Sequence, residues 1–394
     1  MRRHRIITAA GALAAAGLLL SGCATSAAPD AAPDETDGQA AGARIAVTYE
    51  GGIAVLDAAT LEQVAELPIE GFTRVNPVGD GRHVMVTTAE GFQLLDTAAG
   101  TTGEPELTEL VIPADAAGHV VPHAGTTVLF DDATGDATLF DTDAFLGSHE
   151  APESEVVESE DAHHGVALQL EDGTLLTTIG DSESRSGVRA LGAGRKEITR
   201  NEECPGVHGE GTAAGEVAVF GCEDGVLVYA AGAFEKLAAP DEFGRIGNQF
   251  TTHDSPVALG DYNDDPDAEG YVLSSFSLID TAAGELSVHE APAGYTFRDL
   301  ARGPHDEALL LGTDGALHVI DPATGETTAS FPLIDAWEGP AEWQDAHPAL
   351  KVWEHSALVT DPASDRLLAV DVDSGEITAT AQLAAAPVEL AVAG

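Results

Sequence analysis

The segment Leu317-His318-Val319-Ile320-Asp321 predicts a short β-strand, and the polar turn Thr324-Gly325-Glu326 follows it. Similar segments recur along the chain, and the aspartates that end adjacent clear copies lie from 39 residues apart (Asp57 to Asp96) to 50 residues apart (Asp321 to Asp371). Sequence repeats of this length, with four strands each, are typical of the blades of a β-propeller. We therefore expect an all-β propeller. The other clear copies are Ile53-Ala54-Val55-Leu56-Asp57, Phe92-Gln93-Leu94-Leu95-Asp96, Ala137-Thr138-Leu139-Phe140-Asp141, Phe276-Ser277-Leu278-Ile279-Asp280 and Leu368-Ala369-Val370-Asp371.

An apolar run and a tight turn precede these strands, as in residues 308–311 followed by Asp314-Gly315. Such pairs are hairpin signals, and they identify the second and third strands of each blade. Residues 44–49 match a second strand, whereas residues 388–393 match a first strand, the one nearest the central axis. Pairing the two removes exposed sheet edges. The sequence thus predicts eight four-stranded blades within residues 44–394, one of them shared by both ends of this region.

Acidic residues dominate the charge of the chain. Its 394 residues include 67 Asp and Glu against 17 Lys and Arg, for a formal net charge of −50. Binding to nucleic acid or to anionic lipid headgroups needs a basic face, so we expect no nucleic-acid partner and no electrostatic binding to lipid. The acidic field favours cations, although solubility or salt tolerance is the simpler explanation. The acidic run at residues 261–267 is expected to be a surface loop.

Residues 1–22 predict a lipoprotein signal peptide. Three arginines among the first five residues precede an apolar run too short to span a membrane, and Leu20-Ser21-Gly22-Cys23 resembles a bacterial lipobox. In such signals the leader is removed and Cys23 is lipid-modified. We therefore expect an exported protein, anchored by lipid to the outer face of the cytoplasmic membrane in the cell envelope or periplasm. Residues 23–43 are expected to form a flexible tether. The alternative is an ordinary secretory signal with a chance cysteine.

Two further cysteines, Cys204 and Cys222, lie in the predicted propeller. Export places them in an oxidising compartment, where a single pair usually forms a disulfide. The alternative is a pair of thiolate metal ligands. We favour the disulfide.

Four of the 14 histidines occupy equivalent places in their blades. They lie from nine residues (His119 to Val128) to eleven residues (His164 to Leu175) before the first apolar residue of a second strand. Because first strands line the central channel, side chains near their beginning are expected to form a polar ring at one mouth. Imidazoles that converge from separate blades can hold Zn²⁺, which takes about four ligands. The predicted ligands are His119, His164, His208 and His347.

Other residues near this ring are predicted to have lesser roles in the site. Asp161 and Glu210 are placed to ligate a metal directly or to fix a histidine tautomer. His163 is expected to face away from the axis if His164 faces it, because adjacent strand residues point to opposite sides. His123 and His253 lie in turns after first strands, so we expect them toward the opposite mouth, as weaker ligands or a second site.

The residue types leave the metal and part of the function open. Histidine and carboxylate ligands also suit copper or nickel. Whatever the metal, the imidazoles must be neutral, so its affinity is expected to fall below about pH 6.5. The chain has no Gly-x-Ser-x-Gly elbow, no phosphate-binding glycine loop and no plausible cysteine nucleophile, so we expect no enzyme. Two alternatives to a metal carrier are a non-catalytic scaffold propeller at the cell surface and, less favoured, a lyase or hydrolase that uses channel histidines.

The sequence resembles the AztD family of zinc metallochaperones. The resemblance rests on Cys204-Pro205-Gly206-Val207-His208-Gly209-Glu210 with Cys222, on residues 161–165 and on Phe250-Thr251-Thr252-His253-Asp254. It implies zinc binding outside the cytoplasmic membrane and direct transfer of zinc to the solute-binding protein of a zinc ABC transporter. Two features depart from the family: the lipobox, since family members known from Gram-negative bacteria are soluble in the periplasm, and the lack of a long His-rich segment in the tether.

Overall fold

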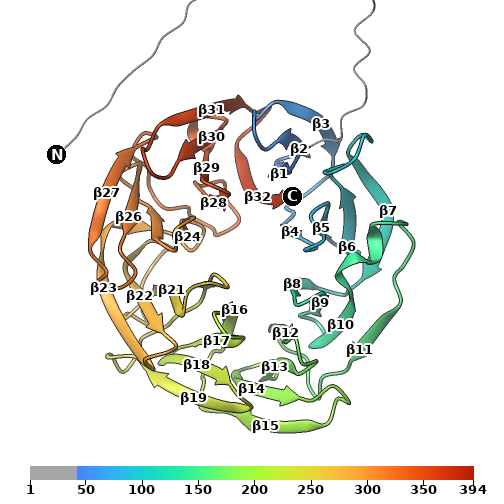
Figure 1. Ribbon diagram of the computed structural model, residues 1–394, viewed down its shortest axis with the longest axis vertical. Coiled ribbons are helices and arrows are strands. Elements are labelled where there is room, and N and C mark those ends of the chain that lie inside the picture. Colours follow the sequence, from blue (N-terminus) through green and yellow to red (C-terminus); the bar gives the residue numbers. More distant parts are fainter. Residues whose placement is uncertain (1–41) are drawn as a thin grey trace, which may run out of the picture. The chain divides into compact units, whose positions relative to one another are not determined.

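The computed structural model describes residues 42–394, which form a ring of eight four-stranded antiparallel sheets around a central axis (Figure 1). The predicted all-β propeller with eight blades is therefore confirmed. Within this part of the chain, helix is limited to two 3₁₀ turns, η1 (Thr142–Phe145) and η2 (Pro362–Ser364). The predicted signal peptide, Cys23 and the tether up to residue 41 lie outside the described residues. Among residues 42–394, no helix is long and apolar enough to cross a membrane.

The four strands of each blade follow one another from the innermost, nearest the central axis, to the outermost at the rim. Blade 1 contains β32 (Pro387–Ala393), β1 (Arg44–Tyr49), β2 (Gly52–Asp57) and β3 (Gln63–Pro68). Blade 2 contains β4 (Val75–Pro77), β5 (His83–Thr88), β6 (Gly91–Asp96) and β7 (Glu106–Pro113). Blade 3 contains β8 (Ala117–His123), β9 (Thr126–Asp131), β10 (Asp136–Asp141) and β11 (Ser154–Val157). Blade 4 contains β12 (Ala167–Gln169), β13 (Leu175–Gly180), β14 (Arg185–Leu191) and β15 (Glu197–Asn201).

The second half of the ring repeats this order. Blade 5 contains β16 (His208–Ala213), β17 (Val217–Cys222), β18 (Gly225–Ala230) and β19 (Ala233–Ala238). Blade 6 contains β20 (Gln249–Phe250), β21 (Val257–Tyr262), β22 (Leu273–Asp280) and β23 (Glu285–Tyr295). Blade 7 contains β24 (Leu300–Arg302), β25 (Ala308–Leu311), β26 (Ala316–Ile320) and β27 (Thr327–Pro332). Blade 8 contains β28 (Leu350–Trp353), β29 (Ser356–Asp361), β30 (Arg366–Asp371) and β31 (Ile377–Gln382).

The two ends of the described region close the ring within blade 1. Strand β32 pairs antiparallel with β1, with Ile45 opposite Val392 and Val47 opposite Leu390. Figure 1 shows the blue and red strands side by side at the top of the ring. This pairing is the one predicted from the two terminal segments, and it covers the edge of β1 that β2 leaves unpaired.

The core lies between neighbouring blades. The middle strands of a blade are buried along most of their length, whereas an outermost strand such as β3 alternates between exposed and half-buried residues. In one cluster, Leu176 and Val188 of blade 4 pack against Phe220 and Leu227 of blade 5. Full burial of each such side chain stabilises the fold by about 1.5–3 kcal/mol. The stacked blades thereby hold the start of each innermost strand in a fixed place around the channel.

Candidate metal centre

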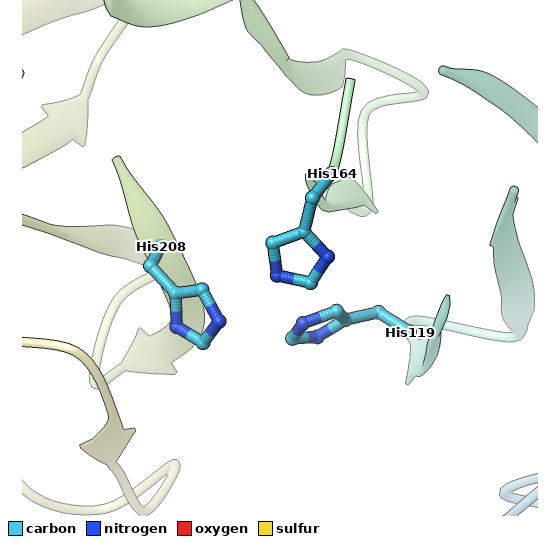
Figure 2. A group of neighbouring side chains, drawn as sticks. All are labelled: His119, His164 and His208. Carbon is cyan, nitrogen blue, oxygen red and sulfur yellow. The ribbon is translucent and has the colours of Figure 1, made fainter. Parts of the chain in front are cut away.

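Three histidines from consecutive blades point toward one another (Figure 2). His119 lies in β8, His164 lies just before β12, and His208 is the first residue of β16. Their ring centroids are 5.7 Å (His119 to His164), 5.6 Å (His119 to His208) and 5.1 Å (His164 to His208) apart. One ring nitrogen of each lies within 4.8 Å of the other two. The structure therefore brings together three of the four histidines predicted to be ligands.

Irregular pairing in two innermost strands sets the direction of two of these side chains. The register of β8 with β9 shifts around His119, and the register of β16 with β17 shifts between His208 and Gly211. Such β-bulges interrupt the strand alternation and redirect a side chain. Gly209 has a φ of 69°, and a Cβ there would lie 2.6 Å from the carbonyl oxygen of Gly247. The turn that follows His208 therefore requires glycine.

An oxygen atom faces Nδ1 of each of the three rings. An acceptor at this position holds the proton on Nδ1 and leaves the lone pair of Nε2 free for a cation. Two of these contacts are hydrogen bonds, His164 Nδ1 with Asp132 Oδ2 at 2.6 Å and His208 Nδ1 with the carbonyl oxygen of Gly247 at 2.6 Å. The third is a longer ionic contact, His119 Nδ1 with Glu210 Oε2 at 3.4 Å. Glu210 therefore contacts a candidate ligand from outside the cluster, which is one of the two roles predicted for it.

The acidic partner of His164 is Asp132, not the predicted Asp161. Asp132 directly follows β9, the second strand of blade 3, and Gly118 leaves room for its carboxylate, since a Cβ on Gly118 would lie 2.5 Å from Asp132 Oδ1. Asp161 is exposed, and its backbone carbonyl oxygen lies 2.9 Å from Nδ1 of His163. The predicted Asp161 therefore does not contact His164 with its carboxylate; Asp132, which is distant from His164 in sequence, does.

Replacing Asp132 by Asn is expected to weaken zinc binding by about tenfold to a hundredfold, because loss of such an outer carboxylate loosens a histidine ligand and lowers its basicity. Competition titration against a chromophoric chelator measures the change. Asp143→Asn, at an exposed position on the same blade, serves as the control and is expected to leave the affinity unchanged. Equal affinities of the Asp132→Asn variant and the unmodified protein would contradict this role.

The three histidines line a cavity of about 540 Å³, together with Arg74, Arg245 and other residues. Burial, and next the neighbouring His119 ring, lower the pKa of His208 well below its usual range. The His208 imidazole is therefore neutral at neutral pH, as metal coordination requires.

His347 does not join the cluster. It lies in blade 8, three blades beyond His208, and is 2% exposed. Its Nδ1 lies 2.7 Å from the backbone carbonyl oxygen of Asp345. Burial, and next the charge of Arg298, lower the pKa of His347 to about 4. Within the described residues, this side chain is part of the packing beside blade 8 and not of the three-histidine group.

His163 also has a packing role in the structure. The side chain is buried, its Nε2 lies 3.1 Å from Oγ1 of Thr178, and its ring lies edge-on to Phe130. It therefore does not share the direction of the neighbouring His164, as the alternation of strand residues predicts.

His123 and His253 form a separate pair. Their rings stack with centroids 5.7 Å apart, and Nε2 of His123 lies 2.8 Å from Oε1 of Glu216. Both line a second cavity of about 220 Å³, which Glu210 also lines. They are therefore apart from the three-histidine group, as the sequence suggested.

The disulfide predicted between Cys204 and Cys222 is present, and both cysteines are fully buried. It joins the segment that leads into β16 to the end of β17. The backbone just before His208 is thus linked covalently to the neighbouring strand.

One residue of the predicted acidic surface loop belongs to the support of the cluster instead. Asp261 is 5% exposed, and its Oδ1 accepts hydrogen bonds from the backbone N–H groups of Gly247 (2.5 Å) and Asn248 (3.1 Å). Gly247 is the residue whose carbonyl faces His208. Asp261 therefore holds the peptide that orients this imidazole, and no motif in the sequence signals that role.

This set of donors suits a divalent transition metal. Three imidazole nitrogens at roughly 2.0–2.1 Å, with a fourth position open, are a common arrangement around Zn²⁺. The partly exposed His164 and the adjoining cavity leave space for an additional ligand from outside the chain.

Comparisons with known proteins agree with the fold. No protein-family model matches the chain. The zinc chaperone AztD of Citrobacter koseri is 22% identical over 306 residues, which cover 74% of this chain and 68% of that protein. Two crystal structures of C. koseri AztD, one of them the apo form, superpose with TM-scores of 0.74 and 0.73 at 19% and 20% identity. Each match covers 89% of this chain and, respectively, 97% and 96% of the AztD chain. The predicted resemblance to the AztD family is thereby confirmed.

A more distant structure shares the propeller fold but belongs to an enzyme. The dihydro-heme d1 dehydrogenase NirN superposes with a TM-score of 0.60 at 13% identity, covering 92% of this chain and 77% of that one. A propeller fold by itself therefore does not identify the activity, which has to be argued from the site.

Proposed function

We propose that this AztD-like propeller is a zinc carrier outside the cytoplasm, and that it passes zinc to the solute-binding protein of a zinc ABC transporter. The observation that carries the proposal is the convergence of His119, His164 and His208, each with an oxygen at Nδ1. The similarity to the C. koseri zinc chaperone supports the choice of zinc over copper or nickel.

The site suits temporary binding better than permanent binding. A structural zinc site is closed by four protein ligands, whereas three imidazoles leave one position open. A histidine or carboxylate of the receiving protein can enter that position before the first imidazole leaves, so zinc is never released to water. The His164 side chain is 40% exposed, against 18% for that of His119, and is the natural place for exchange to begin.

Transfer can be tested directly. The zinc-loaded chain is mixed with the metal-free solute-binding protein in the presence of a chelator that captures free zinc, and the two proteins are then separated and analysed for metal. We expect zinc on the solute-binding protein despite the chelator. If all zinc lost by the propeller is found on the chelator, the carrier proposal fails, although zinc binding itself stands.

The same donor set is also used by catalytic zinc, since three histidines and an open position can activate a bound water. This keeps a channel lyase or hydrolase as the second candidate. Turnover of ester or carbon dioxide substrates by the zinc-loaded protein, lost in the His164→Ala variant, would favour it. We propose a non-catalytic role, and therefore expect rates no higher than those of the same variant.

Zinc affinity is expected to fall as the pH drops from 7.5 to 5.5. Protons compete with zinc for imidazole, and burial lowers the pKa of His208 well below its usual range, so that this ligand competes least for protons. The affinity is therefore expected to fall less steeply than it would if all three imidazoles competed equally with protons. Competition titrations at several pH values measure the slope. An affinity that does not change with pH would argue against histidine ligands.

We also propose that lipid on Cys23 holds the carrier at the outer face of the cytoplasmic membrane, close to the transporter it supplies. The lipobox supports this location. Mass spectrometry of the mature N-terminus is expected to find an acylated Cys23, and a Cys23→Ser variant is expected in the soluble fraction. A mature chain cleaved elsewhere and free of lipid would refute the anchor.

A further inference from the structure

We propose that this chain has a second divalent metal site, formed by His83, Asp96 and His149 between blades 2 and 3. The metal it would take is a transition cation of the zinc or cobalt class. His83 is the first residue of β5, Asp96 is the last residue of β6, and His149 lies between η1 and β11 of the next blade. The site is independent of the three-histidine group, with which it shares no residue.

The spacing of the donor atoms matches the edge of a tetrahedral metal site. Two nitrogens bound to zinc at about 2.0–2.1 Å with tetrahedral angles lie about 3.3 Å apart. Nε2 of His83 and Nε2 of His149 are 3.3 Å apart, and Nε2 of His149 is 3.2 Å from Oδ2 of Asp96. Nε2 of His83 is 3.9 Å from Oδ1 of Asp96. Small movements of the Asp96 carboxylate would complete a trigonal face for one cation.

A buried carboxylate orients the His83 ring. Oδ2 of Asp80 lies 2.5 Å from Nδ1 of His83, and the side chains of both residues are fully buried. Oδ1 of Asp80 accepts hydrogen bonds from the backbone N–H groups of Arg82 (2.9 Å) and His83 (2.8 Å). The proton is thereby held at Nδ1, and the lone pair of Nε2 points toward His149. A carboxylate behind a histidine in this way is typical of metal ligands.

The charges around the site permit a cation of moderate affinity. Arg82 makes two hydrogen bonds to the Asp96 carboxylate through Nε and Nη2, and so offsets part of its negative charge. The Asp96 side chain is 6% exposed, whereas that of His149 is 31% exposed, so an ion and a water ligand can enter from the His149 side. We expect weaker binding here than at the three-histidine group.

The consequence of occupancy would be structural. His149 belongs to the connection between η1 and the outermost strand of blade 3, and the other two ligands belong to blade 2. A bound cation would therefore link two neighbouring blades at a place where the described chain has no disulfide. Binding would stabilise the folded state, because the site exists only when both blades are in place.

The test uses a protein in which the three-histidine group is inactivated by His164→Ala and His208→Ala. Zinc or cobalt alone is titrated into this protein and into the same protein with His149→Ala added. His149→Ala is preferred over changes at the buried His83 because it lies in a connection and leaves the core intact. His355→Ala, in the exposed group of His305, His355 and Asp373, is the matched control.

We expect one bound zinc ion per chain in the starting variant, with a raised melting temperature, and the loss of both effects with His149→Ala but not with His355→Ala. Co²⁺ is expected to give the visible absorption of a low-coordinate site under the same conditions. The proposal is overturned if the starting variant binds no metal, or if binding persists unchanged with His149→Ala. Neither result affects the zinc-carrier proposal, which is tested separately by the transfer experiment and by the His164→Ala, His208→Ala variant.

Discussion

Replacing His164 and His208 together by Ala is expected to abolish stoichiometric zinc binding at the three-histidine group and to lower its affinity by about ten-thousandfold. Zinc sites with four protein ligands contribute about 10–16 kcal/mol of binding free energy, or about 3 kcal/mol for each ligand. Each lost ligand thus costs about 150-fold in affinity. Titration against a chelator of known affinity, with metal analysis after desalting, measures this loss.

The matched control is His163→Ala combined with His347→Ala, which removes two of the predicted ligands that the structure places outside the cluster. This control is expected to retain the affinity of the unmodified protein where it remains folded, as checked by its circular dichroism. Undiminished binding in the His164→Ala, His208→Ala variant would mean that zinc is held elsewhere.

Removing the disulfide by Cys204→Ala and Cys222→Ala is expected to lower the free energy of unfolding by about 3 kcal/mol. The bond closes a loop of 18 residues, and the loss of chain entropy in the unfolded state accounts for a contribution of about that size. For a domain of this length, the melting temperature is expected to fall by roughly 4 °C. Thermal unfolding followed by circular dichroism measures both quantities.

A reducing agent provides the control for this second prediction. It is expected to destabilise the unmodified protein to a similar extent and to have no further effect on the double variant. Equal melting temperatures of the variant and the oxidised protein would show that the bond contributes nothing to stability.

The fold could be predicted because its signals are local and repeated. Hairpins such as residues 308–311 followed by Asp314-Gly315 mark the middle strands of a blade, and β25 and β26 lie at those positions. The shared blade followed from the strand types of the two terminal segments, and β32 pairs with β1 as expected. Neither inference required knowledge of distances across the ring.

Predicting which histidines form the cluster, in contrast, requires knowledge of distances across the ring. The repeat places His347 at a position equivalent to that of His208, but equivalent positions in different blades lie around a ring, and a metal site a few ångströms wide can be reached only from neighbouring blades. His119, His164 and His208 belong to three consecutive blades, whereas His347 belongs to blade 8. Blade adjacency, which can be counted from the repeats, would have excluded His347.

The carboxylate partner was missed for a related reason. In an antiparallel blade the end of the second strand lies beside the start of the first, as in the pairing of Ala117 with Asp131. Asp132 directly follows a second strand and so lies near the beginning of the first strand of its own blade. There its carboxylate contacts His164 of the following blade, 32 residues away in sequence. The bulge at His208 and the support from Asp261 depend on backbone geometry that no local sequence pattern specifies.

Anomalous diffraction at the zinc absorption edge, from crystals grown with zinc, tests the central claim most directly. We expect a strong peak within about 2.0–2.1 Å of Nε2 of His119, His164 and His208, with a solvent or partner ligand in the remaining position. A zinc-bound crystal without a peak between these three rings would contradict the account.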